Sequence, residues 1–127
     1  MKKLFSKFGT KIKQFLLRFI AKRSKGEKEV IKYLKGNKIK FKQQVPLKID
    51  NKQLFLDFQL HNGIIIEYNG KQHYRYTPYF HKSKQDFVKQ QNRDKKLRKY
   101  CEDNNIKLIE IPYYISNINT YLKRKLK

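Results

Sequence analysis

The sequence contains little cysteine, glycine and proline. Cys101 is its only cysteine, which excludes an internal disulfide and a cysteine-based metal cluster. This composition gives no sign of an oxidising compartment, so we expect an intracellular protein. Five glycines and three prolines among 127 residues are too few for a long structureless linker. One domain with a modest core is therefore expected.

Long hydrophobic runs are also missing. No apolar stretch reaches the roughly 18 to 20 residues that are needed to cross a bilayer. Lysines interrupt every candidate core of a signal peptide. The sequence therefore predicts a protein without an integral membrane segment.

Acidic residues are scarce relative to basic ones. The chain has 32 Lys and Arg against 10 Asp and Glu, for a formal net charge of +22. A field of this strength attracts polyanions, and nucleic acid is the first candidate partner. An anionic membrane surface or a ribosome would also be attracted, and a nucleotide-biased genome can produce a lysine-rich chain without any such function. The charge supports a class of partner and does not indicate a reaction.

Residues 1 to 25 contain no acid, and their apolar residues recur at helical spacing from Leu4 to Ile20. This pattern predicts a basic amphipathic helix over residues 1 to 23, followed by a domain over residues 24 to 127. A nucleic-acid-binding arm, a membrane-surface helix and a transit-type peptide all fit the composition. A helix that docks its apolar face on the domain fits it equally well.

The rest of the chain predicts the order helix, three strands, helix, strand, helix. Ser24 and Glu27 form a capping box for a helix from about Gly26 to Lys35, with Gly36 as its C-terminal stop. The other predicted elements are strands over 39–45, 54–60, 64–68 and 106–111, and helices over 83–103 and 116–125.

Two of these strands form a hairpin that carries one acid in each arm. The three-residue loop between them contains Asn-Gly, whose residues tolerate the positive φ of a tight turn. If the flanking residues Leu60 and Ile64 pair, Asp57 lies directly opposite Glu67 on the same face of the sheet. Two carboxylates so placed repel each other unless a cation lies between them. Mg²⁺ is the simplest such cation, because it prefers hard oxygen ligands completed by water.

A histidine follows the second arm of this hairpin. His73 lies just after Glu67, past a turn that can fold it back toward the two carboxylates. An imidazole is the best available group to accept or donate a proton near neutral pH. His61 and His81 lack such a setting, and we expect both to be ordinary surface histidines.

Two other acids each allow two interpretations. Asp94 either forms an i to i+4 ion pair with Arg98 on a solvated helix face, or faces the hairpin and orients His73. Glu27 needs no function beyond the capping box, yet its place in the first turn of a helix also allows it to face an acidic site.

The order of these residues resembles a known nuclease family. The segments that carry the resemblance are Glu27, Asp57-Phe58, Ile66-Glu67-Tyr68-Asn69-Gly70, Gln72-His73, Arg93-Asp94, Tyr100-Cys101, Asn105-Ile106-Lys107-Leu108-Ile109 and Ile111-Pro112-Tyr113. They are similar to the Vsr-like (very-short-patch-repair), or EDxHD, branch of the PD-(D/E)XK endonuclease superfamily, in particular to small endonuclease-like proteins of phages and giant viruses. The resemblance covers about residues 24 to 115.

The resemblance implies a fold, an activity and a setting. The fold is an α/β restriction-endonuclease-like core, with a mixed β-sheet of about four strands flanked by helices. The activity is that of an endonuclease dependent on Mg²⁺ or Mn²⁺, which hydrolyses phosphodiester bonds of DNA by nicking or double-strand cleavage. RNA is a second possible substrate. The setting is intracellular, in the cytoplasm or nucleoid or in the host cell of a mobile element.

The resemblance also implies roles for particular residues. The motif of the family falls on five catalytic residues: Glu27, Asp57, Glu67, His73 and Asp94. Among them Asp57 and Glu67 hold the metal. Contacts with nucleic acid are expected from Lys71, Gln72, Tyr74, Arg75 and Arg93. Tyr74, Tyr76 and Tyr79 either stack on bases or belong to the core and rim of the domain.

The chain departs from the family pattern in three ways. Asn69 stands where related sequences usually carry Asp, and the lysine that commonly follows the second acid is absent, so catalysis relies on His73. The cysteine-rich zinc element of the repair enzymes is also absent, which makes mismatch repair less expected than other cleavage. Two alternatives stand beside the nuclease: a nucleic-acid-binding protein of the same fold that has lost turnover, and a membrane-surface or targeted protein that acts through its N-terminal helix.

Overall fold

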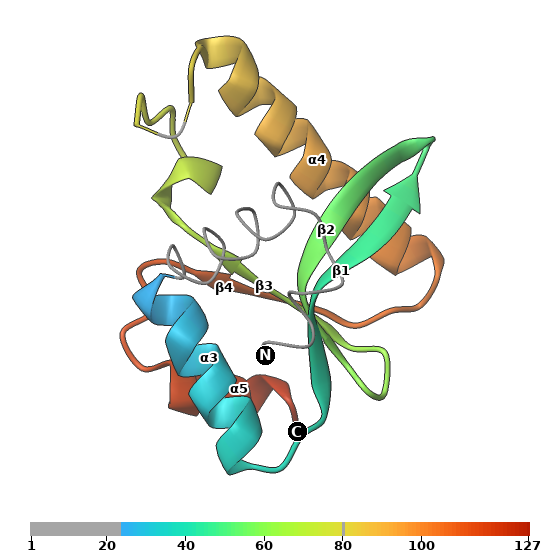
Figure 1. Ribbon diagram of the computed structural model, residues 1–127, viewed down its shortest axis with the longest axis vertical. Coiled ribbons are helices and arrows are strands. Elements are labelled where there is room, and N and C mark those ends of the chain that lie inside the picture. The colour runs from blue at the N-terminus through green and yellow to red at the C-terminus, as the bar shows by residue number, and fades with distance from the viewer. Residues whose placement is uncertain (1–23, 80) are drawn as a thin grey trace, which may run out of the picture.

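The computed structural model describes residues 24–79 and 81–127. The expected α/β class is confirmed, since an open, mixed, four-stranded sheet is flanked by helices (Figure 1). The elements are α3 (Lys25–Gly36), β1 (Phe41–Ile49), β2 (Lys52–Leu60), β3 (Ile65–Asn69), the 3₁₀ helix η1 (Lys71–His73), α4 (Lys84–Asp103), β4 (Leu108–Pro112) and α5 (Ile118–Lys125). The amphipathic helix predicted over residues 1–23 lies outside the described residues.

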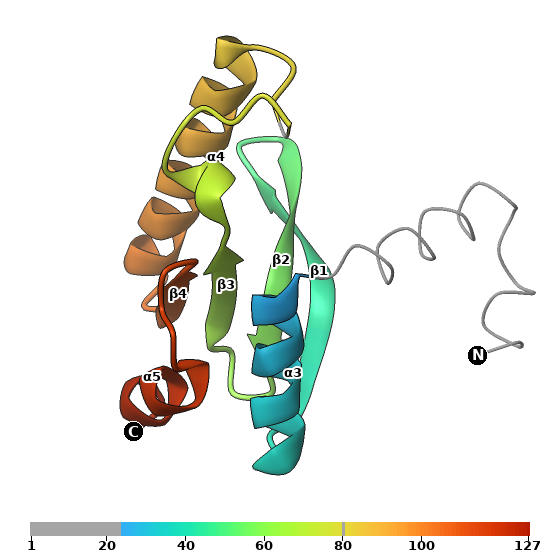
Figure 2. The same ribbon diagram turned by 90° about the vertical axis from the view of Figure 1, so that its left-hand side faces the viewer.

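The sheet runs in the order β1-β2-β3-β4. β1 pairs with β2 and β2 with β3 in antiparallel fashion, whereas β3 and β4 are parallel. Parallel neighbours need a long crossover connection, and α4 supplies it. Figure 2 shows the result, with α3 and α4 on opposite sides of the sheet.

Two groups of buried side chains hold these layers together. The first core joins α3 and α5 to one face of the sheet, through residues such as Leu34, Ile66 and Leu122. The second core joins α4 to the other face, and its buried members are Leu56, Ile65, Leu97 and Cys101. Because successive strand residues point to opposite faces, Ile65 and Glu67 share the α4 face.

The β2–β3 hairpin has the register that the sequence predicted. Phe58 pairs with Ile66, and the Leu60 N–H donates to the Ile64 carbonyl at 2.8 Å. Gly63 closes the three-residue loop with a φ of 91°, a conformation that glycine adopts without steric cost. This register places Asp57 across from Glu67.

Two predicted boundaries were wrong. β1 continues past Val45 through Pro46, which an edge strand tolerates because the missing N–H faces away from the neighbouring strand. It then turns into β2 through Asp50 and Asn51, both with positive φ. Gly36 was predicted to follow the last residue of the helix, whereas it is itself the last residue of α3, and Asn37 is the C-cap.

Candidate active site

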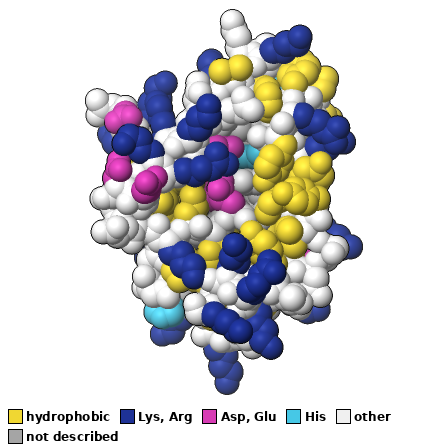
Figure 3. All heavy atoms as spheres, turned by 180° about the vertical axis from the view of Figure 1, so that it is seen from behind, with side chains coloured by type: hydrophobic (Ala, Val, Ile, Leu, Met, Phe, Trp, Pro, Cys, Tyr) yellow, Lys and Arg dark blue, Asp and Glu magenta, His cyan; other side chains and the backbone are white. Residues whose placement is uncertain are grey.

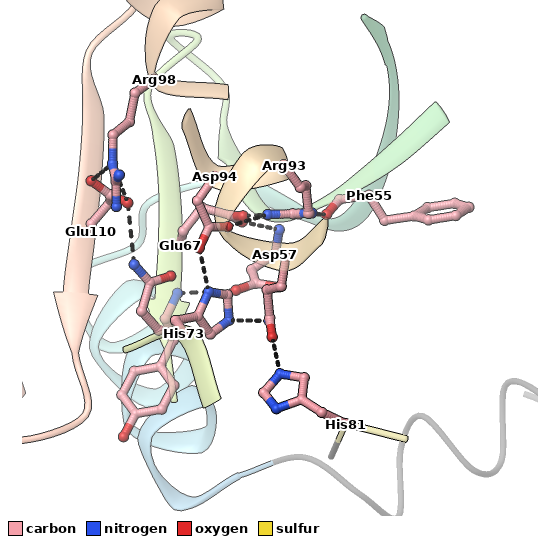
Figure 4. Close-up of polar contacts among 12 residues, drawn as sticks. Phe55, Asp57, Glu67, His73, His81, Arg93, Asp94, Arg98 and Glu110 are labelled. Carbon is pink, nitrogen blue, oxygen red and sulfur yellow. Dashed lines mark hydrogen bonds and ion pairs between the residues drawn. The ribbon is translucent and has the colours of Figure 1, made fainter. Parts of the chain in front are cut away.

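Asp57 and Glu67, called the carboxylate pair below, lie across from each other just beyond the last β2–β3 pair, Phe58 and Ile66, on the α4 side of the sheet (Figure 4). Each carboxylate accepts a backbone N–H of the opposite strand: Glu67 Oε2 from Asp57 at 2.6 Å, and Asp57 Oδ2 from Tyr68 at 3.0 Å. Gln44 of β1 lies across from Asp57 with a φ of 50°, outside the regular strand pairing. Its amide hydrogen-bonds to the Asp57 carboxylate. The backbone thus holds the two acids side by side.

Both acids of the carboxylate pair are poorly solvated. Glu67 is 3% exposed, and its burial, followed by the negative charge of Asp57, raises its pKa to about 7. Burial also raises the pKa of Asp57, although the Tyr68 N–H and the Arg93 guanidinium act in the opposite direction. Raised pKa values on both acids mean that this buried site disfavours their ionised forms. The pair therefore favours an added proton or cation.

Arg93 of α4 brings positive charge to the carboxylate pair. Its Nη2 donates to Glu67 Oε1 at 3.2 Å and to the Phe55 carbonyl at 2.9 Å. Its Nη1 lies 3.1 Å from Asp94 Oδ1. The sequence assigned Arg93 to nucleic-acid contact, whereas the structure engages its guanidinium with two acids and a backbone carbonyl. Arg93 therefore ties α4 to β2 and β3.

His73 and Asp94 meet, as one of the two interpretations of Asp94 requires. His73 Nδ1 lies 2.8 Å from Asp94 Oδ2, and the two side chains are 13% and 7% exposed. η1 turns the chain back after β3, with the His73 N–H donating to the Gly70 carbonyl. The other interpretation, an ion pair of Asp94 with Arg98, was wrong. Arg98 pairs instead with Glu110 of β4 at 2.9 Å.

Gln90 of α4 links His73 to His81, and the hydrogen bonds along this chain determine which nitrogen of each ring carries the proton. The Thr77 N–H donates to His81 Nδ1 at 3.0 Å, so His81 carries its proton on Nε2, 2.8 Å from Gln90 Oε1. The amide nitrogen of Gln90 then faces His73 Nε2 at 3.1 Å. His73 consequently carries its proton on Nδ1, toward Asp94. Its Nε2 lone pair is the position that can accept a proton.

His81 is not the surface histidine that the sequence predicted. It is 4% exposed, and its ring stacks on Tyr76 and meets the edge of Phe87. Its hydrogen-bond partners come from the preceding loop and from α4, so no local pattern in the sequence marks it.

Replacing His81 with alanine is expected to lower the free energy of unfolding by about 2 kcal/mol, because the change leaves a cavity and removes two partly buried hydrogen bonds. Urea unfolding followed by far-UV circular dichroism measures this. His61 is exposed in the β2–β3 loop, and His61→Ala should change stability by less than about 0.5 kcal/mol. Equal effects of the two changes would contradict the buried role of His81.

Glu110 and Asn69 extend the polar cluster toward β4, and sequence analysis missed Glu110. Glu110 pairs with Glu67 across the parallel strands. It accepts two bonds from Arg98 and one, at 3.2 Å, from the Asn69 amide. The Asn69 side chain also hydrogen-bonds to Tyr74. An ionised aspartate at position 69 would have no N–H to give Glu110, so the asparagine suits this neighbour.

Glu27 lies on the α3 side of the sheet. Its N–H donates to Ser24 Oγ at 3.2 Å, which confirms Ser24 as the N-cap of α3. A Cβ added to Gly26 would lie 2.1 Å from the Tyr68 ring, so the start of α3 presses directly against Tyr68. Burial, Glu29 and then Glu27 raise the pKa of the Tyr68 hydroxyl. Glu27 therefore stands beside Tyr68, whereas the other four predicted catalytic residues meet on the α4 side.

The side chains predicted to bind nucleic acid surround the site unevenly. Three of them are exposed, Lys71, Tyr74 and Arg75, while Gln72 is half-buried. Among the tyrosines predicted to stack on bases, Tyr74 packs with Tyr113 and Tyr114, with ring centroids 5.8 and 6.3 Å away. Figure 3 shows one face of the molecule, where acidic side chains and a histidine lie between basic side chains and a hydrophobic patch.

In the part of the chain that the structure describes, no group of three or more His, Cys, Asp or Glu side chains gathers in a way that could hold a metal ion. The metal predicted for this site therefore depends on the carboxylate pair alone. Across the same residues, no helix is both long and apolar enough to cross a membrane.

Comparison with known proteins finds viral relatives whose names assign them no activity. The chain is 55% identical over 62 residues to "Uncharacterized protein 307L" of Invertebrate iridescent virus 6, a match that covers 49% of this chain and 32% of the relative. It is 45% identical over 67 residues to "Uncharacterized protein 033L" of Invertebrate iridescent virus 3, covering 51% of this chain and 34% of the relative.

A third relative is "Uncharacterized protein 094L" of Frog virus 3 (isolate Goorha), 48% identical over 62 residues, which cover 48% of this chain and 40% of the relative. The chain thus spans roughly a third of the length of the curated relatives it matches. No family model and no solved structure matches it.

Proposed function

We propose that this protein is a metal-dependent endonuclease of the Vsr-like type, which hydrolyses phosphodiester bonds of DNA. The observation that carries the proposal is the carboxylate pair, with both pKa values raised, in one polar network with a histidine that Asp94 orients. The net charge of +22 supports a polyanionic substrate.

The donor set suits Mg²⁺ or Mn²⁺. Mg²⁺ is usually held by one or two carboxylates, with water and substrate phosphate as its remaining ligands. Asp57 and Glu67 are two hard oxygen donors with excess negative charge, and they would hold the ion. When bound, such an ion supplies positive charge that stabilises the charge developing on the phosphate oxygens.

The other residues of the network prepare a proton acceptor. Asp94 holds the Nδ1–H of His73, which leaves Nε2 to take a proton from the water that attacks phosphorus. In the structure Gln90 donates to this Nε2, so the attacking water must take the place of the Gln90 amide. Asp94 then stabilises the imidazolium that forms. The leaving oxygen of the phosphodiester takes up a proton from solvent or from the same imidazolium.

One contact favours the second candidate, a nucleic-acid-binding protein of the same fold without turnover. The Arg93 guanidinium already pairs with Glu67 and Asp94, so it supplies the site with part of the positive charge that a metal would bring. In that case the carboxylate pair only fixes α4 against the sheet through Arg93, and the basic surface binds the nucleic acid.

Nicking of supercoiled plasmid separates the two candidates. The protein is expected to convert supercoiled to relaxed or linear DNA with Mg²⁺ or Mn²⁺ and to leave it intact with EDTA. Asp57→Ala should remove the activity, since it deletes one of two metal ligands. Salt-sensitive DNA binding without any metal-dependent cleavage would favour the binding protein. Cleavage by Asp57→Ala at the parent rate would contradict the catalytic assignment.

A further inference from the structure

A cleft of about 730 Å³ opens between the far half of the β1–β2 hairpin and α4. Its hairpin wall includes Lys52, Leu54 and Phe55, and its helix wall includes Lys89, Arg93 and Lys96. The volume lies within the range of sites that enclose small molecules. The basic surface is therefore hollowed at this place.

The cleft borders the candidate active site through Arg93. Arg93 lines it and also binds the Phe55 carbonyl, Glu67 and Asp94. Phe55 precedes Asp57 by two residues in β2, and Figure 4 shows its ring pointing away from the carboxylate pair. Arg93 is therefore the boundary that the carboxylate pair and the cleft share.

The charge of the cleft has one sign. Five of its ten described lining residues are Lys or Arg, and none of the ten is acidic. Lys89, Arg93 and Lys96 follow one another at i, i+4 and i+7 and so share one face of α4. Lys52 brings a cation from the opposite wall. Cations on both sides suit a chain of phosphates that runs between them.

The apolar part of the cleft distinguishes unpaired from paired nucleic acid. Ile49, Leu54 and Phe55 lie among the cations, and Phe55 is 46% exposed. A duplex keeps the faces of its bases stacked inside and offers mainly phosphates and groove edges. An unpaired strand offers base faces as well, and these stack on aromatic side chains in single-strand sites.

We propose that the hairpin–α4 cleft binds an unpaired nucleic-acid strand next to the cleavage site, with phosphates on Lys89 and Lys96 and a base on Phe55. This proposal depends on the proposed function in one respect, because it takes the carboxylate pair as the cleavage site. It makes DNA with an unpaired segment, such as a flap or a displaced strand, the preferred substrate class.

Binding in EDTA tests the cleft without any cleavage. The probes are a fluorescent oligothymidylate of about 10 nucleotides, a duplex of equal length, and an abasic strand that keeps the phosphates. The length of about 10 nucleotides lies within the usual site size of folds that bind single strands. Lys89→Ala/Lys96→Ala should weaken oligothymidylate binding and lower the slope of log K against log salt by about 1.4, or about 0.7 for each lost phosphate contact. Lys28→Ala/Lys35→Ala is the matched control, with the same spacing and charge change on exposed positions of α3.

Phe55→Leu keeps an apolar residue in the strand and removes the ring. It should lower affinity for oligothymidylate at least about fivefold and leave affinity for the duplex and the abasic strand unchanged. Three results would each overturn the proposal. The parent could bind the abasic strand as tightly as oligothymidylate, or the two double lysine variants could lose the same affinity. A polyglutamate peptide could also displace the labelled strand as well as unlabelled oligothymidylate does. If binding behaves as expected while plasmid nicking is absent, the proposed function fails and the cleft assignment stands. If the parent nicks plasmid in a metal-dependent way while the cleft variants bind oligothymidylate as the parent does, the cleft assignment fails and the proposed function stands.

Discussion

Replacing His73 with alanine is expected to lower the rate of Mg²⁺-dependent plasmid nicking by about a hundredfold or more, the usual contribution of a positioned general base. The reason is the hydrogen-bond arrangement: Asp94 holds Nδ1 at 2.8 Å, and Nε2 is the only ring position left to accept a proton. Binding of the same plasmid in EDTA should change little, because His73 is 13% exposed and contributes little surface. Single-turnover nicking together with a filter-binding assay measures both quantities.

Two further variants test whether the effect belongs to the chemistry of His73. His61→Ala removes an exposed histidine from the β2–β3 loop and should nick at the parent rate. Asp94→Asn keeps the shape of its side chain but no longer favours the Nδ1–H tautomer, so a large loss is expected with binding intact. A His73→Ala protein that nicks as fast as the His61→Ala protein would exclude His73 as the base.

The carboxylate pair was predictable from the sequence because a short loop fixes a register. Asn62-Gly63 in a three-residue loop allows only a narrow choice of pairing between β2 and β3, and the hydrophobic alternation agrees with it. The opposition of Asp57 and Glu67 then follows by counting residues. Local sequence was sufficient here because the two strands are adjacent in the chain.

The partners of the carboxylate pair were less predictable because they are remote in sequence. Arg93 and Glu110 reach Glu67 only after α4 crosses over and β4 joins the sheet in parallel. Neither the rotation of α4 nor the register of β4 is encoded by a short loop. The same reason accounts for His81, whose burial depends on Gln90 across a loop.

The twist of the β1–β2 hairpin was also beyond the sequence pattern. Leu56 and Phe58 are two residues apart and would share one face of a regular strand, yet Leu56 belongs to the second core and Phe58 to the first. The change falls at Asp57, opposite Gln44 with its positive φ. This twist brings the far half of the hairpin beside α4 and so creates the cleft that Phe55 lines.

In metal-free buffer the protein is expected to lose about 3 kcal/mol of stability as the pH rises from 4.5 to 7. The pKa of Glu67 is raised from 4.5 to about 7 in the folded protein, and each unit of difference corresponds to about 1.4 kcal/mol. Between these values the folded state keeps a proton that the unfolded state has released. The free energy of unfolding therefore falls with rising pH, and Asp57, whose pKa is also raised, acts in the same direction.

Urea unfolding at a series of pH values in EDTA measures this slope. Glu67→Gln cannot ionise and should remove most of it, whereas Glu102→Gln, a change at an exposed position of α4, should leave it unchanged. Equal slopes in all three proteins would show that Glu67 does not carry the excess charge inferred from its environment.

Added Mg²⁺ should reverse the loss, because an ion held by the ionised carboxylate pair binds the folded state in preference to the unfolded one. At a hundred times its dissociation constant such a ligand stabilises by about 2.7 kcal/mol. We therefore expect Mg²⁺ to raise the melting temperature of the parent above pH 7 and to have little effect near pH 4.5, where Glu67 is protonated. Glu67→Gln should show little stabilisation at either pH. A parent protein that Mg²⁺ does not stabilise above pH 7 would leave Arg93 as the counter-ion of the pair and favour the binding protein over the nuclease.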